Sequence, residues 1–124
     1  MDLIIGGAYQ GKLNYAVNKY GFSKEALFDL SAGFPDKDRA CFYHLEALTR
    51  RAAAEGLSPD EIVKSLLPHI KNAVVISREV GCGIVPTDKA ERLFRETHGA
   101  VLRKLAEKAD SVTRIFCGLE ERLK

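Results

Sequence analysis

Short apolar segments alternate with amphipathic segments along the chain, a pattern that predicts strands alternating with helices. The expected strands are residues 3–5, 26–30, 73–77 and 112–117. The runs LII at residues 3–5 and VVI at residues 74–76 are apolar without alternation, which is typical of strands covered on both faces. We therefore expect an α/β fold of the three-layer type, with these two strands central in a small, mainly parallel sheet of about four strands.

Helical periodicity predicts the elements between the strands. Residues 12–20 carry apolar side chains on one face and are followed by Gly21, which is typical of a helix end. Residues 36–55 show a mostly helical pattern that ends at Gly56. The sequence SPDE at residues 58–61 has the form of a capping box, which opens a third helix that we expect Pro68 to end or kink.

A fourth helix is expected after Thr87, its predicted N-cap. Gly99 lies within its apolar stripe, so we expect this helix to be divided in two. The chain of 124 residues is long enough to bury one core, and it contains no internal repeat or long linker. One domain over residues 1–124 is therefore expected.

Residues 2–13, DLIIGGAYQGKL, have the glycine and lysine spacing of a phosphate-binding loop between a strand and a helix. Backbone N–H groups, the helix N-terminus and the lysine would together stabilise phosphate oxygens. The alternative is a plain strand-to-helix turn with a solvated lysine. We call residues 6–13 the glycine-lysine loop, and the expected nucleotide-binding residues are Gly6, Gly7, Ala8, Tyr9, Gln10, Gly11, Lys12 and Leu13.

One position of this loop departs from the usual pattern. Leu13 follows Lys12, where such loops place a Ser or Thr hydroxyl on Mg²⁺. A bound Mg²⁺ would therefore need carboxylates or water, and the candidates are Asp29 and Glu79, each at the end of an expected strand. For Asp29 a loop-capping role is an equal alternative.

Charge and cysteine content narrow the function classes. The net charge is +2, with basic and acidic residues mixed along the chain, so we expect no nucleic-acid partner. Three widely spaced cysteines predict reduced thiols rather than a disulfide framework. No apolar run approaches the roughly 18 residues of a membrane span, and the first residues do not resemble a signal peptide. A cytoplasmic protein without a membrane span is expected.

Residues 74–112 contain several motifs in a characteristic order. EVGCGIVP at residues 79–86 is followed by RLFR at residues 92–95, by Gly99 and by ADSV at residues 109–112. This segment closely resembles the bifunctional adenosylcobinamide kinase and adenosylcobinamide-phosphate guanylyltransferase family of cobalamin synthesis. The loop IIGGAYQGK and the ending CGLEERLK also resemble that family.

The resemblance implies a phosphate-loop α/β protein, commonly a trimer, that binds ATP or GTP and phosphorylates the aminopropanol arm of cobinamide. Lys12 and the loop amides would bind phosphates, while Asp29 and Glu79 would manage metal and water. Arg95 is a candidate for neutralising charge that develops in the reaction. Arg92 lies three residues before Arg95 on the same helix face, and a solvated basic face is the alternative for both.

The chain departs from the family where a histidine accepts GMP. The family segment resembles H-R-x-x-R-P-x-x-W, whereas His44 lies in HLEALTRRA and the chain has no tryptophan. We therefore expect His44 to be a packing or surface residue of a helix rather than the histidine that accepts GMP. His69 and His98 are still weaker candidates for that histidine. Three hypotheses remain: a kinase for a cobinamide-like alcohol, a nucleotide-binding or regulatory homologue without turnover, and a fold whose loop binds nothing.

Overall fold

The computed structural model describes residues 1–80 and 88–124. It contains a six-stranded sheet in the order β2-β3-β4-β1-β5-β6. The strands are β1 (Asp2–Gly6), β2 (Leu27–Asp29), β3 (Cys41–Tyr43), β4 (Val74–Arg78), β5 (Ser111–Phe116) and β6 (Leu119–Arg122). Strands β2, β3, β4, β1 and β5 pair in parallel, and β6 pairs with β5 in the antiparallel sense. The expected mainly parallel α/β fold is confirmed, but four strands were too few.

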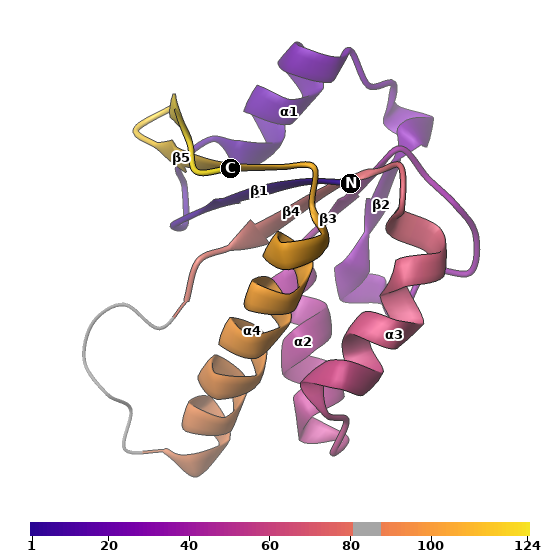
Figure 1. The fold of residues 1–124 in the computed structure, drawn as a ribbon, viewed down its shortest axis with the longest axis vertical. Helices are drawn as coiled ribbons and strands as arrows, with labels where there is room; N and C mark the ends of the chain where they lie inside the picture. Colours follow the sequence, from indigo (N-terminus) through magenta and orange to yellow (C-terminus); the bar gives the residue numbers. More distant parts are fainter. Residues whose placement is uncertain (81–87) are drawn as a thin grey trace.

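Helices cover both faces of this sheet, which gives three layers (Figure 1). The helices are α1 (Lys12–Tyr20), α2 (Leu45–Ala54), α3 (Pro59–Ile70) and α4 (Lys89–Lys108). Figure 1 shows α1 on one face and the other three helices on the opposite face. Leu3 belongs to the core on the three-helix side and Ile4 to the core on the α1 side. This double burial explains why β1 is apolar without alternation and confirms that β1 and β4 are central.

The expected helix over residues 36–55 was wrong in its first half. Strand β3 occupies Cys41–Tyr43, and α2 begins only at Leu45. Phe42 is buried on the three-helix side and Cys41 on the other, so the strand is fixed by burial on both faces. Three residues are too few to show a strand period, and their spacing also fits a helical pattern.

Other boundaries also differ from the sequence-based expectations. The strand expected at residues 26–30 is shortened to β2 because 3₁₀ turns occupy residues 24–26 and 30–32. Strand β6 was missed because all of its residues are exposed, so it carries no hydrophobic pattern. Pro68 lies inside α3 and does not end it.

Helix α4 is continuous through Gly99, so the expected division of this helix was wrong. A single interior glycine costs about 1 kcal/mol, which buried neighbours on the same helix offset. Thr87, the expected N-cap, lies outside the described residues, as does Cys82. The described N-cap is Asp88, whose carboxylate accepts a hydrogen bond from the backbone N–H of Ala90 at 3.0 Å.

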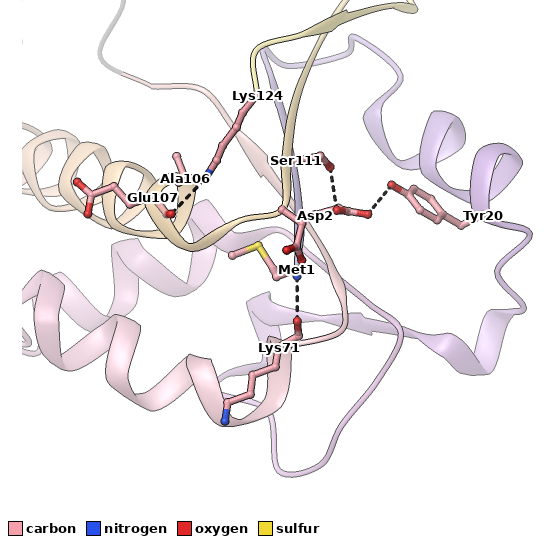
Figure 2. Close-up of polar contacts among 9 residues, drawn as sticks. Met1, Asp2, Tyr20, Lys71, Ala106, Glu107, Ser111 and Lys124 are labelled. Atoms are coloured by element: carbon pink, nitrogen blue, oxygen red, sulfur yellow. Dashed lines mark hydrogen bonds and ion pairs between the residues drawn. The ribbon is translucent and has the colours of Figure 1, made fainter.

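Side-chain contacts link helices and strands at the amino-terminal end of β1 (Figure 2). Asp2 accepts hydrogen bonds from the Ser111 hydroxyl at 2.8 Å and from the Tyr20 hydroxyl at 3.0 Å. Lys124 donates from Nζ to the Ala106 carbonyl at 3.0 Å, in the last turns of α4. These contacts lie at the opposite end of β1 from the glycine-lysine loop, so they stabilise the fold without occupying the loop. Within the described ranges, no helix is long and apolar enough to cross a membrane.

Candidate functional site

The glycine-lysine loop connects the carboxyl end of β1 to the N-terminus of α1. A Cβ atom at Gly6 would lie 2.6 Å from the Ile115 backbone oxygen, so the close approach of β1 to β5 requires glycine there. Gly11 precedes α1 with φ of 83°, a left-handed conformation that glycine adopts at no steric cost. Tyr9 is also left-handed, with φ of 59°, and its side chain is fully exposed. Glycine is therefore required at Gly6 by the close approach of two strands and is favoured at Gly11 by the left-handed backbone.

Lys12 folds back over this loop. Its Nζ donates a hydrogen bond to the Gly7 carbonyl oxygen at 2.7 Å. Burial lowers the pKa of the Lys12 amine, the Glu46 carboxylate raises it, and the Arg78 guanidinium lowers it further. Lys12 therefore lies close enough to both Glu46 and Arg78 for their charges to act on its amine.

Backbone and side-chain hydrogen bonds hold the loop between β4 and β5. The Glu79 N–H donates to the Gly6 carbonyl at 2.7 Å, and the Cys117 N–H donates to Gln10 Oε1 at 2.6 Å. The Glu79 carboxylate forms an ion pair with Arg114 at 3.2 Å. Glu79 thus braces the loop through its backbone, while its carboxylate is engaged by an arginine.

The loop opens into a cavity of about 380 Å³, which we call the first cavity. It is lined by residues 8–14 of the loop and α1, by Tyr43, His44 and Glu46 around the start of α2, and by Ile76 and Arg78 of β4. Its place at the carboxyl ends of the parallel strands is where open α/β sheets bind ligands. Its volume lies within the range of small-molecule sites.

A second cavity of about 570 Å³ lies between α2, α4 and the end of β4. Arg50 Nη1 donates to Glu91 at 2.6 Å, and its guanidinium lies 3.9 Å from the centre of the Phe94 ring. Arg95 approaches the same Glu91 carboxylate at 3.8 Å. The Arg50 hydrogen bond is the main reason that the pKa of Glu91 is lowered. The walls of this cavity therefore carry charges of both signs, largely paired.

The residues proposed from sequence are divided between these cavities. Lys12 and Leu13 line the first cavity, whereas Glu79 and Arg95 line the second. Asp29 is not among the residues that line either cavity. It ends β2, which β3 and β4 separate from β1.

The Asp29 carboxylate already has partners within the chain. It accepts a hydrogen bond from the Ser31 N–H at 2.9 Å and lies 2.9 Å from His44 Nδ1. Burial opposes its ionisation, but the contacts with Ser31 and His44 outweigh burial, so the pKa of Asp29 is lowered. His44 is the N-cap of α2 rather than a residue within a helix, and it lines the first cavity.

Two residues common to both cavities, Glu46 and Arg78, were missed by the sequence reasoning. Arg78 follows the buried run of β4, so the argument that identified Glu79 also applied to Arg78. Glu46 lies in the segment whose first half was wrongly assigned to helix, and no sequence signal distinguished it. The Arg78 side chain is exposed and makes no hydrogen bond or ion pair with the described part of the chain.

The three positions considered from sequence, Leu13, Asp29 and Glu79, do not fit a Mg²⁺ ion held by the protein itself. Leu13 offers no hydroxyl and packs against the core on the α1 side. Asp29 is paired with His44, and Glu79 is paired with Arg114. Within residues 1–80 and 88–124, no group of three or more His, Cys, Asp or Glu side chains is placed to hold a metal ion.

Comparisons with known proteins place the chain in a family. The protein-family model described as cobinamide kinase / cobinamide phosphate guanyltransferase matches residues 43–123, more than half of the chain. The bifunctional adenosylcobalamin biosynthesis protein CobU of Salmonella typhimurium is 39% identical over 51 residues, which cover 41% of this chain and 28% of that protein. The chain thus aligns with little more than a quarter of this curated relative. The glycine-lysine loop precedes the span that the family model matches. The match over residues 43–123 shows that the chain belongs to the cobinamide kinase / cobinamide phosphate guanyltransferase family.

Proposed function

We propose that the chain binds ATP or GTP at the glycine-lysine loop and transfers the γ-phosphoryl group to cobinamide. The observation that carries this proposal is the first cavity, in which Lys12 and the loop meet at the carboxyl edge of the sheet. The loop amides and Lys12 bind the phosphates, with Lys12 moving from the Gly7 carbonyl to the nucleotide. Phosphoryl transfer depends mainly on such positioning and charge stabilisation.

In this proposal the second cavity binds the acceptor of the phosphoryl group. Because the two cavities share Glu46 and Arg78, an acceptor in the second lies next to a nucleotide in the first. In this proposal Arg95 stabilises negative charge that develops during transfer, and Glu79 supports the loop through Gly6. The proposal also includes one cytoplasmic domain that assembles as a homotrimer, as the family resemblance implies.

The test measures binding and transfer separately. Nucleotide binding is followed by the shift in unfolding temperature with ATP or GTP, because stabilisation follows RT ln(1 + [L]/Kd). Transfer is followed with γ-labelled nucleotide and cobinamide. Lys12→Ala is expected to weaken binding about 10- to 100-fold, the value of a charge-assisted hydrogen bond. Lys19→Ala, on the exposed end of α1, is the matched control and should change neither result.

Each outcome of this test separates the hypotheses. A temperature shift without transfer would support a nucleotide-binding homologue without turnover, the alternative favoured by Leu13. Absence of any shift at millimolar nucleotide would contradict both nucleotide hypotheses. Wild-type nucleotide binding and a wild-type rate of transfer in Lys12→Ala would show that the glycine-lysine loop is not the site.

A second candidate function, guanylyl transfer through His44, is favoured by one contact. His44 lines the first cavity, and Asp29 is hydrogen-bonded to its Nδ1, which orients the imidazole. In this candidate, Nε2 of His44 attacks the α-phosphorus of GTP, and pyrophosphate leaves. The guanylyl group then passes to the phosphorylated acceptor.

A further inference from the structure

The two cavities meet at Glu46 and Arg78. Glu46 lies in the first turn of α2, one turn before Arg50 of the second cavity. Arg78 ends β4, where it pairs in register with Gly6 at the start of the glycine-lysine loop. A group that moves from a nucleotide in the first cavity to an acceptor in the second must pass these two side chains.

Glu46 has an unusual hydrogen-bonding state. Its Oε2 atom is buried and has no hydrogen-bond partner in the described part of the chain. An unpaired buried polar atom is costly in a native protein, and a catalytic role is one of the reasons for which such an atom is retained. The other two carboxylates of the second cavity are paired, Glu79 with Arg114 and Glu91 with Arg50. Glu46 is therefore the carboxylate best placed to accept a proton or hydrogen bond from a ligand.

The neighbouring charges suit phosphoryl transfer. The charges of Glu46 and Arg78 both act on the Lys12 amine, and all three side chains line the first cavity. The guanidinium of Arg78 has no internal partner among the described residues, which leaves it available to phosphate oxygens. Two cations and one unpaired carboxylate thus surround the junction of the cavities.

We propose that Glu46 is the catalytic base of this reaction and that the second cavity holds the alcohol end of the acceptor. This inference rests on the proposed phosphoryl transfer. The acceptor hydroxyl gives its proton to Glu46 Oε2 as its oxygen forms a bond to the γ-phosphorus. The bond from that phosphorus to the β–γ bridging oxygen breaks, and the nucleoside diphosphate leaves with the electron pair. Lys12 and Arg78 stabilise the negative charge on the transferring group.

The size of the second cavity defines the acceptor class. A volume of about 570 Å³ admits a small alcohol, or the hydroxyl-bearing arm of a larger molecule whose remainder stays outside. Arg50 and Arg95 are engaged by Glu91, and Arg51 donates to the Ser31 carbonyl. Arg78 faces the transferring phosphoryl group in this proposal, so Glu46 is left to accept a hydrogen bond from the hydroxyl of a neutral alcohol arm.

The test uses Glu46→Gln in the full chain with γ-labelled ATP and cobinamide. Gln keeps the size of the side chain but cannot take up the proton. We expect nucleotide binding to persist and kcat to fall about 10²- to 10⁴-fold. The wild-type rate should fall as the pH is lowered, because the base becomes protonated, and this fall should be absent in Glu46→Gln. Glu46→Asp keeps the acidic group and should retain the pH dependence at a reduced rate. Glu96→Gln, exposed on α4 and outside both cavities, is the matched control and should match the wild type.

The outcomes distinguish this inference from the proposed function. If the wild-type chain transfers phosphate and Glu46→Gln does so at the same rate, Glu46 is not the base and only this inference fails. If the wild-type chain binds nucleotide but transfers nothing to cobinamide, the proposed function is rejected together with the role of Glu46. If urea titration shows that Glu46→Gln does not fold, Glu46→Asp becomes the deciding variant. A wild-type rate of transfer and a rate that does not change with pH in Glu46→Asp would reject the inference.

Discussion

His44 Nδ1 lies 2.9 Å from Asp29 Oδ1, and this contact joins the ends of β2 and β3 beside the first cavity. His44 has φ of 62°, a left-handed conformation that costs a non-glycine residue of order 1 kcal/mol or more. The Tyr43 ring lies 4.7 Å from the imidazole, centre to centre. Asp29 and Tyr43 therefore hold the ring in place, and Nε2 is the nitrogen left for a ligand.

The first prediction concerns covalent labelling of His44. After incubation with α-labelled GTP and denaturation, the wild-type chain should retain label, and His44→Asn should retain none. His69→Asn is a matched control, because His69 Nδ1 also contacts an aspartate, Asp38, at 3.1 Å but lines neither cavity. Label that persists on His44→Asn, or that is absent from the wild type, would refute guanylyl transfer through His44.

The second prediction concerns the two glycines at the start of the loop. In Gly6→Ala the new methyl group would meet the Ile115 oxygen at 2.6 Å, so we expect a loss of about 1 to 3 kcal/mol in the free energy of unfolding. In Gly7→Ala the nearest atom, Gln10 Cγ, lies at 3.7 Å, and the change should stay within about 0.5 kcal/mol. Urea denaturation measures both. Equal stability of the two variants would contradict the close approach of β1 to β5.

The third prediction concerns Mg²⁺. Because the Leu13 side chain has no oxygen, we expect the affinity of the wild-type chain for ATP to change little when EDTA replaces Mg²⁺. Leu13→Thr supplies the hydroxyl found in other loops of this kind and should make binding tighter with Mg²⁺ than with EDTA. Calorimetric titration in both buffers measures the difference. Leu13→Val removes similar bulk without adding a hydroxyl, so a matching gain in Leu13→Val would show that the hydroxyl is not responsible.

The fourth prediction concerns acid stability and the buried His98. Burial lowers the pKa of His98 to about 4, although a hydrogen bond with the Arg78 carbonyl opposes that effect. The unfolded chain has an ordinary histidine pKa near 6.5, so between these values it binds a proton that the native state does not. Stability from neutral His98 is therefore present above about pH 6.5 and is lost progressively as the pH falls toward 4.

The size of this effect can be isolated by mutation. Between pH 7 and pH 5 the wild type should lose about 2 kcal/mol more than His98→Gln, whose amide can still donate to the Arg78 carbonyl. Urea titrations at several pH values measure the difference. Parallel curves for the two proteins would show that His98 does not carry this dependence.

The strongest local signals in the sequence predicted the elements around the loop. Residues 12–20 form α1 with the expected bounds, because the apolar face and Gly21 are both local features. The capping box of α3 is present, with Ser58 and Glu61 each bonded to the backbone of the other. The family resemblance over residues 74–112 is confirmed at the level of the family by the match over residues 43–123.

The sequence by itself determined an α/β family member with a glycine-lysine loop between a central strand and a helix, because local hydrophobic spacing and motif order are enough for that. The tertiary structure decided which side chains surround the loop. Strand β3 is fixed by burial of Phe42 and Cys41 on opposite faces, which no local pattern reveals. Its insertion between β2 and β4 separates Asp29 from β1 and brings Glu46 to the cavity beside Lys12.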